Sequence, residues 1–330
     1  LYFKSKKKGI NCIVDSFFLC MNAVKHGDFN GNIIIIIMVI KIIIIIIIKI
    51  VIFIVMILKW RYNIFVEKVE RSAYYMAYTI AVTNHKGGVG KSSISMALFN
   101  GLNEKGYKCL FVDMDSQANS TYALGADPNQ INTFNIMTIK DTDVESAIQT
   151  TFQGDVIAGN QALAAMDTVL TNVGKEFRLK EALASAQDKY DFIILDTPPA
   201  LGVLTINALT ASDGVVVPTN ADIFSLQGID ELNNTIQTVQ KYCNPNLRLL
   251  GMVLNQYNPR TNLTKRITEL LDESTGNLNT RLYNTRIRSC NAIKEAAAFS
   301  DSIFSYAPNS NASVDLSALV DEVLESIHNK

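Results

Sequence analysis

The sequence predicts an α/β protein with a doubly wound, mostly parallel sheet and helices on both faces, preceded by an isoleucine-rich hydrophobic segment. From Met76 onward, short apolar runs rich in β-branched residues alternate with segments of helical periodicity. Strands buried on both faces have such continuous apolar runs, because neither face meets water. The first run leads into a glycine-rich loop and two others end in aspartate, at the edge where such sheets bind ligands.

The predicted elements follow one another at regular intervals. The first strand covers Tyr78–Asn84 and leads through a glycine-rich loop to a helix over Ser92–Lys105. Further strands are expected at Cys109–Asp113, Asp155–Ala158, Phe192–Asp196, Gly214–Pro218 and Leu249–Leu254, with helices at Leu226–Tyr242 and Val314–His328. No repeat or linker interrupts the series, so residues 76–330 are predicted to form one domain.

The N-terminal segment and this domain differ in net charge. Of the 30 basic and 31 acidic residues, 11 and 4 lie within residues 1–75, so the remainder carries 19 basic and 27 acidic residues. The acidic balance of the domain disfavours nucleic-acid binding through its overall field. Any contact with phosphates therefore requires a local basic patch.

The cysteines and histidines exclude several classes of site. The chain has five cysteines, and none of them forms a C-x-x-C pair or has a histidine at metal-ligand spacing. This argues against a zinc site and a disulfide framework. With three histidines in the chain, a histidine-based catalytic scheme is also disfavoured. We expect a reducing, cytoplasmic setting.

Residues 1–75 have two competing interpretations. Ile33–Leu58 is long enough to span a bilayer as a helix, which needs about 20 residues. However, Lys41 and Lys49 interrupt it, and each costs roughly 2.5–3.5 kcal/mol near a bilayer centre. Isoleucine codons are AT-rich, so translated AT-rich sequence upstream of a start at Met76 is the favoured explanation, and a membrane anchor is the alternative. The run lies too far from the terminus and is too long for a cleavable signal peptide.

The loop after the first strand carries the most informative motif. Residues 85–92 read His-Lys-Gly-Gly-Val-Gly-Lys-Ser. Their second half matches the phosphate-loop pattern G-x-x-x-x-G-K-[ST], in which backbone amides and a helix N-terminus bind phosphates, the lysine neutralises them and the hydroxyl binds Mg²⁺. Candidate nucleotide-binding residues are Lys86, Gly87, Gly88, Val89, Gly90, Lys91, Ser92 and Ser93, with Ser92 as a Mg²⁺ ligand.

Carboxylates follow two other predicted strands. Asp113 and Asp115 lie at the end of Cys109–Asp113, and Asp196 ends Phe192–Asp196. Carboxyl ends of parallel strands meet at one edge of the sheet, so we expect all three beside the phosphate loop. A lone strand-end aspartate is often a helix cap. Three such residues beside a phosphate loop indicate a metal and nucleotide site.

These motifs together resemble the deviant Walker A superfamily, which includes the ParA/Soj partition ATPases, MinD and the nitrogenase iron protein. The resemblance implies that Lys86 reaches the phosphates of a partner in an ATP-dependent homodimer. It also implies that Asp115 activates the attacking water, whereas Asp113 and Asp196 serve the Mg²⁺ shell. Ser116 and Ala118 depart from the usual proline and glycine, which affects the expected hydrolysis rate more than nucleotide binding.

The resemblance to ParA extends over residues 76–330 and implies further sites. Asn255 suits the adenine edge because its amide both donates and accepts, and Pro218 is expected nearby. ParA proteins bind DNA non-specifically through basic residues in the C-terminal part of the fold, which here correspond to Arg260, Arg286, Arg288 and Lys294. Structural salt bridges are the alternative role for these four side chains.

Two other branches of the superfamily fit less well. Val314–Lys330 is an acidic amphipathic helix that anionic lipid would repel, unlike the basic membrane helix of MinD. Cys109 lies on an apolar strand and is expected to be buried, which disfavours the cluster of the iron protein.

The leading hypothesis is a Mg²⁺-dependent ATPase for plasmid or chromosome partition. It binds duplex DNA non-specifically, has weak basal activity stimulated by a ParB-like partner, and is cytoplasmic and nucleoid-associated. The alternative is a MinD-like or cargo-positioning ATPase without a DNA function, tethered to the inner membrane by Ile33–Leu58 with its ATPase domain facing the cytoplasm.

Overall fold

The computed structural model describes residues 76–140, 142–258, 262–277 and 280–328, together with scattered helical positions between Ile42 and Met56. The chain divides into two compact units, Leu1–Tyr74 and Tyr75–Lys330. Most of Ile33–Leu58 lies outside the described residues, so its interpretation stays a prediction. Within the described part of the chain, none of the helices combines the length and the apolar character needed to cross a bilayer.

The second unit is built on an eight-stranded sheet with the order β3-β4-β2-β5-β1-β6-β7-β8. All neighbouring strands are parallel except β3 and β4. The predicted doubly wound, mostly parallel sheet is therefore confirmed. The strands are β1 (Tyr78–Val82), β2 (Cys109–Asp113), β3 (Ile148–Thr151), β4 (Gly154–Ile157), β5 (Phe192–Asp196), β6 (Gly214–Asn220), β7 (Arg248–Tyr257) and β8 (Leu282–Arg288).

The edge strands β3 and β8 are not among the strands expected from the apolar runs. β3 has the sequence Ile-Gln-Thr-Thr and is only partly buried, and β8 carries Asn284, Arg286 and Arg288 among its apolar residues. An edge strand is covered less completely than a central one, so its sequence lacks the continuous apolar run that marks a buried strand.

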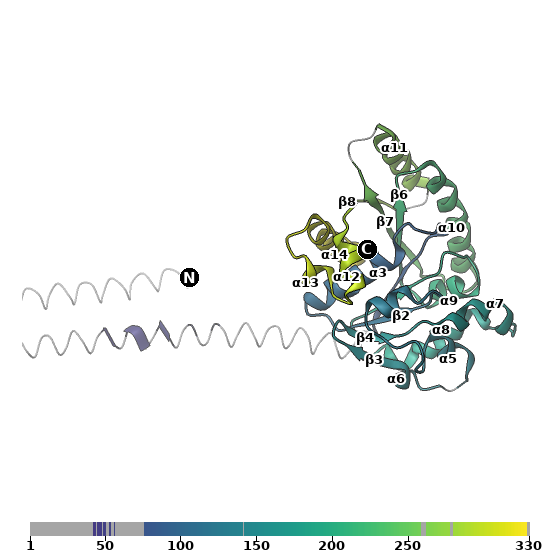
Figure 1. The fold of residues 1–330 in the computed structure, drawn as a ribbon, viewed down its shortest axis with the longest axis horizontal. Coiled ribbons are helices and arrows are strands. Elements are labelled where there is room, and N and C mark those ends of the chain that lie inside the picture. The colour runs from purple at the N-terminus through teal and green to yellow at the C-terminus, as the bar shows by residue number, and fades with distance from the viewer. Residues whose placement is uncertain are drawn as a thin grey trace, which may run out of the picture. The chain divides into compact units, whose positions relative to one another are not determined.

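Helices cover both faces of the sheet (Figure 1). In β1, Ile80 and Val82 join the apolar cluster under α3 (Lys91–Glu104) and α14 (Asn311–His328), whereas Ala81 joins the opposite cluster. The latter is covered by helices that include α5 (Thr133–Thr138), α8 (Arg178–Ala182), α9 (Val203–Ala211), α10 (Ile223–Tyr242) and α11 (Asn262–Asn277). Successive strand residues point to opposite faces, so both faces need apolar side chains.

The C-terminal helix α14 packs through its apolar face. Leu316, Leu319, Val320 and Val323 of α14 are buried, and they share one cluster with α3. Gly101 allows this close approach, because a Cβ atom there would lie 2.7 Å from Val320. Two shorter helices, α12 (Ala292–Ala298) and α13 (Ile303–Tyr306), follow β8, and α13 contacts both α12 and α14 (Figure 1).

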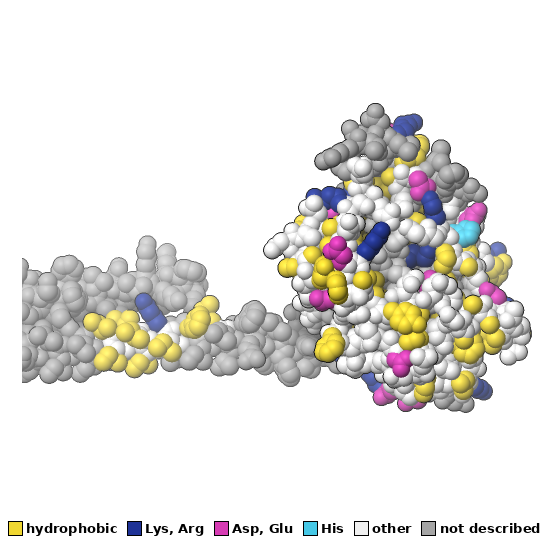
Figure 2. Space-filling model, in the orientation of Figure 1, with side chains coloured by type: hydrophobic (Ala, Val, Ile, Leu, Met, Phe, Trp, Pro, Cys, Tyr) yellow, Lys and Arg dark blue, Asp and Glu magenta, His cyan; other side chains and the backbone are white. Residues whose placement is uncertain are grey.

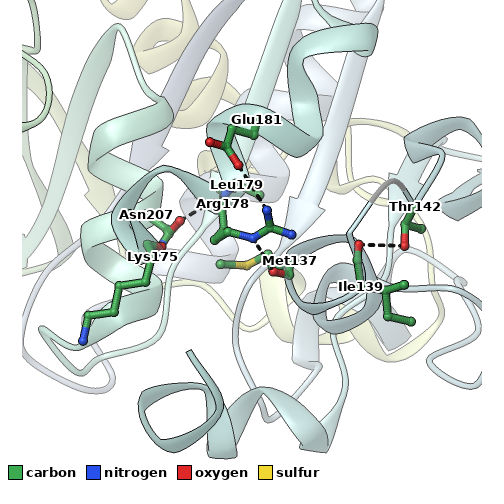
Figure 3. A network of polar contacts seen from close by, with 8 residues as sticks. All are labelled: Met137, Ile139, Thr142, Lys175, Arg178, Leu179, Glu181 and Asn207. Atoms are coloured by element: carbon green, nitrogen blue, oxygen red, sulfur yellow. Dashed lines mark hydrogen bonds and ion pairs between the residues drawn. The ribbon is translucent and has the colours of Figure 1, made fainter. Parts of the chain in front are cut away.

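On the other face, a polar network holds the segment after β4 against α9 (Figure 3). The buried side chain of Asn207 accepts a hydrogen bond from the Leu179 amide at 3.0 Å and donates to the Lys175 carbonyl at 2.9 Å. The Arg178 guanidinium donates to the Met137 carbonyl at 3.0 Å and pairs with Glu181. These contacts join α5 and α8 to α9, the helix that follows the loop after Asp196.

Candidate functional site

The glycine-rich loop joins the central strand β1 to α3. Gly88 and Gly90 adopt positive φ angles of 75° and 90°, which favour glycine. Gly90 also has no room for a side chain, because a Cβ atom would lie 2.0 Å from Nδ2 of Asn255. Gly90 is the N-cap residue of α3, and no side chain caps the first amides of the helix by a hydrogen bond. Those amides therefore remain able to bind an anion at the positive end of the helix.

Two amide side chains at the end of β7 hold this loop. Nδ2 of Asn255 donates to the Val89 carbonyl at 2.8 Å, and Nε2 of Gln256 donates to the Gly88 carbonyl at 3.2 Å. Gln256 has a φ of 53°, a left-handed conformation that is uncommon outside glycine. Asn255 thus supports the phosphate loop in this structure, and its contact with adenine stays a prediction. The contribution of Gln256 was not apparent from the sequence.

Pro218 lies within β6, and its register partner in β7 is Val253. Its carbonyl accepts a hydrogen bond from Nδ2 of Asn84, the residue two positions before Lys86, at 2.7 Å. Proline lacks a backbone N–H donor. Because the pairing of β6 with β1 ends at Val216, no hydrogen bond between these two strands is lost at Pro218. Pro218 therefore braces the start of the loop, and its predicted contact with adenine stays a prediction.

Lys91 begins α3 and is almost fully buried. Its ammonium group donates to the Lys86 carbonyl at 3.0 Å, within the loop itself. Burial lowers the pKa of Lys91, while the charges of Asp196 and Asp115 raise it. The lysine, the loop and two of the predicted carboxylates are therefore brought together.

Asp113 and Asp196 are register partners at the ends of β2 and β5. Both are fully buried. Burial and the neighbouring Asp196 raise the pKa of Asp113 to about 7, and burial raises the pKa of Asp196 to about 6. Two adjacent buried carboxylates repel one another, so a divalent cation would relieve the cost of ionising them.

The short helix α4 (Asn119–Ala123) supplies hydroxyl groups to both carboxylates. Oγ of Ser120 donates to Asp196 at 2.5 Å, while Thr121 donates to Asp113 from Oγ1 at 2.7 Å and from its amide at 2.9 Å. Both side chains are fully buried. The sequence gives no sign of this role, although both residues lie a few positions after Asp115.

Asp115 lies just beyond β2 and is partly exposed. It accepts the Gln117 amide at 3.0 Å, and its own amide donates to Asp113 at the same distance. Ala118 then adopts a φ of 52°, which explains why glycine is usual at this position. The alanine accepts a strained conformation at the start of α4, so the departure affects the segment that carries Asp115.

Lys86 projects from the loop toward the turn before α10. Its ammonium group lies 2.5 Å from a carboxylate oxygen of Asp222, and the neighbouring His85 contacts Glu231 of α10. Both members of the Lys86 pair are about one-third exposed, at 31% and 33%. Lys86 therefore has an acidic partner, Asp222, on its own chain.

The residues predicted to contact DNA are divided among different environments. Arg288 forms a two-point pair with Asp315 of α14, at 2.8 and 2.6 Å, and Arg286 is half-buried in β8. Lys294 is exposed on α12, and Arg260 lies outside the described residues. Figure 2 shows basic and acidic side chains interspersed on one face of the second unit. Arg288 thus has a structural partner, whereas Lys294 is accessible.

These residues fit a phosphate group with Mg²⁺. The anion would meet the α3 amides and Lys91, and the cation would lie near Ser92, Asp113 and Asp196. No cluster of three or more His, Cys, Asp or Glu side chains suited to a metal occurs among the described residues. Mg²⁺ does not need one, because it usually keeps several waters and binds one or two carboxylates together with substrate phosphates.

Comparison with known proteins agrees with this geometry. The AAA domain family matches residues 77–249. The sporulation initiation inhibitor protein Soj of Bacillus subtilis is 37% identical over 253 residues, covering 75% of this chain and 98% of Soj. The chromosome partitioning protein ParA of Caulobacter vibrioides is 31% identical, covering 69% of this chain and 86% of ParA.

The chain belongs to the ParA/Soj family. A solved structure of cobyrinic acid a,c-diamide synthase from Mycobacterium smegmatis, with a bound ATP analogue and magnesium, is also similar, at 29% identity and a TM-score of 0.65. The superposed region covers 77% of this chain and 96% of the synthase chain. The family match includes the phosphate loop and all three aspartates, and it ends before Asn255. As a ParA/Soj protein, the chain is a P-loop ATPase of the ParA type.

Proposed function

We propose that this protein is a Mg²⁺- and ATP-dependent switch ATPase that partitions a plasmid, chromosome or other DNA element. The observation that carries the proposal is the placement of Lys91 beside Asp115 and the buried pair Asp113 and Asp196. The similarity to Soj and ParA supports the partition role, and the magnesium and ATP analogue of the mycobacterial structure support the cofactors.

Each polar group has a distinct part in the proposed reaction. The loop amides and Lys91 bind the phosphates, and Mg²⁺, when bound, offsets their charge. The Ser92 hydroxyl and the carboxylates of Asp113 and Asp196 hold the cation, directly or through water. Asp115 is exposed enough to orient water for attack on the terminal phosphate and to accept its proton.

Lys86 completes the site of a second copy of the chain. It lies at the surface on the loop, where its ammonium group can exchange Asp222 for a phosphate of the partner's nucleotide. ATP would thereby hold the homodimer together, and hydrolysis would release it. A ParB-like protein is the proposed stimulator of that step.

The dimer would bind duplex DNA without sequence preference, through phosphate contacts of accessible basic side chains such as Lys294. This assigns the protein to the cytoplasm, in association with the nucleoid. The acidic balance of the domain makes such binding weak for one subunit, so two subunits acting together are needed for useful affinity.

Two variants test the proposal. Lys91→Ala should abolish ATP binding, because the phosphates lose their main counter-charge. Asp115→Ala should bind ATP and dimerise but hydrolyse at least about 100-fold more slowly, the usual contribution of such a group. Nucleotide binding by calorimetry and phosphate release measure the two effects. Full turnover by Asp115→Ala, or ATP binding by Lys91→Ala, contradicts the assigned roles.

A further inference from the structure

The short helix α4 is attached at both ends to parts of the site that are far apart in sequence. Its Ser120 and Thr121 donate to the buried carboxylates of Asp196 and Asp113. At its other end, the carbonyls of Tyr122 and Ala123 accept hydrogen bonds from side chains outside the helix. The helix contains five residues, so a shift at either end moves the whole element.

Gln153, in the turn between β3 and β4, makes the central connection. Its Nε2 donates both to the Ala123 carbonyl and to the Ser300 carbonyl, each at 2.9 Å, and its Oε1 accepts from Asn100 of α3 at 2.8 Å. All the polar atoms of this side chain are thus engaged. The following Gly154 brings the turn against α3, because a Cβ atom there would lie 2.7 Å from the Phe99 ring.

Ser300 supplies a second connection between the same elements. It follows α12, and its hydroxyl donates to the Tyr122 carbonyl at 3.0 Å. Its φ of 51° is left-handed, and its amide bonds to Ala297 at 3.2 Å, so the turn is part of the end of α12. The carboxyl end of α4 is therefore fastened directly to the helix that carries Lys294.

We propose that α4 couples the metal-binding carboxylates to α12, with Gln153 as the positioning residue that fastens α4 to the turn at Ser300. The inference rests on the proposed binding of Mg²⁺ and ATP beside Asp113 and Asp196. Binding of the cation changes the charge that Ser120 and Thr121 contact, and α4 passes the resulting shift to Ser300. Coupling is reciprocal, so loosening α4 at Gln153 weakens cation binding as well.

The test uses the full chain with Mg²⁺ and the β,γ-imido analogue of ATP. Gln153→Glu keeps the size of the side chain and its acceptor toward Asn100, but loses both donated hydrogen bonds. Gln149→Glu is the matched control, because Gln149 lies on the same hairpin and exchanges two hydrogen bonds with the backbone of Asp127 instead of α4 and Ser300.

Two measurements are made on each protein. The Mg²⁺ concentration for half-maximal analogue binding should rise about fivefold in Gln153→Glu, at the lower end of the range for coupled sites. Hydrogen exchange of residues 292–300 should respond to Mg²⁺ and analogue in the wild type, and this response should fall by at least about half in the variant. The control should match the wild type in both.

Ser300→Gly provides an independent variant, because glycine adopts a φ of 51° without strain while removing the hydroxyl. It should change both readouts in the same direction. If loop 86–92 is protected by analogue but residues 292–300 do not respond, or respond equally in wild type and variants, the coupling is wrong and nucleotide binding stands. If the loop itself gains no protection, the proposed function fails, and the coupling fails with it.

Discussion

The ammonium group of Lys86 lies 2.5 Å from the carboxylate of Asp222 on the same chain. If Lys86 binds the partner's phosphates, this pair must break before the dimer can close. Partly exposed pairs contribute less than about 1 kcal/mol, which corresponds to about fivefold in an equilibrium. Asp222→Asn should therefore strengthen ATP-dependent dimerisation by about two- to fivefold.

Sedimentation with the β,γ-imido analogue of ATP measures this effect. Asp321→Asn is a suitable control, because it removes a carboxylate of α14 that pairs with Lys105, the residue after α3, at 2.8 Å. Weaker dimerisation in Asp222→Asn would show that the aspartate orients Lys86 for the partner and does not compete for it.

The steric relation between Gly90 and Asn255 makes a second prediction. A methyl group at Gly90 would collide with the Asn255 amide and break its bond to the Val89 carbonyl. Gly90→Ala should destabilise the protein by roughly 2 kcal/mol or more, from the collision and the positive φ together. Asn255→Ala should recover part of this loss in the double variant, because the collision is removed and the φ strain remains. Thermal denaturation of all four proteins measures the cycle, and purely additive losses would contradict it.

The buried carboxylates predict a pH dependence of stability in the absence of metal. Asp113 and Asp196 bind protons more tightly in the folded chain than in the unfolded chain, because burial raises their pKa values to about 7 and about 6. The free energy of unfolding should therefore decrease as pH rises from about 4 to about 7. Denaturant unfolding across this range measures the slope.

Asp196→Asn isolates the cause of that slope. It removes one titrating group and the charge that raises the pKa of Asp113. Ser95 and Ser120 each donate to a different oxygen of Asp196, so one of them can keep donating to the amide oxygen while the other reverses its hydroxyl to accept from the NH2 group. At pH 8 the variant should be more stable than the metal-free wild type by at least about 1 kcal/mol, although it should bind Mg²⁺ more weakly. An unchanged slope would exclude the carboxylate pair as its origin.

Two of the candidate DNA-binding residues, Lys294 and Arg288, should behave differently when substituted. Lys294 is exposed, so Lys294→Ala should weaken duplex binding and reduce the salt dependence by about one phosphate contact. Arg288 is held by Asp315 at two points, so Arg288→Ala should lower the free energy of unfolding, with a smaller change in salt dependence. Binding titrations at several salt concentrations, paired with denaturation curves, separate the two. Equal salt slopes for both variants would contradict the assignment.

Much of the fold follows from local patterns. The central strands are predictable because they are buried on both faces and therefore consist of continuous apolar residues, and the boundaries of Cys109–Asp113 and Phe192–Asp196 agree with the structure. The edge strands β3 and β8 are less apolar, and they become strands through pairing with neighbours that lie far along the chain or across a turn.

The sequence alone determined the phosphate loop, because Gly90, Lys91 and Ser92 act within a few residues of one another and their spacing is local. It also located the three aspartates, because Asp113 and Asp196 end apolar runs and Asp115 lies two residues beyond one. Only the tertiary structure decided which partners these residues meet: Asn255 against the loop, Asp222 against Lys86, and Ser120 against Asp196. Such contacts join residues that are 76 to 166 positions apart, and they depend on the strand order and register of the sheet, which no local pattern specifies.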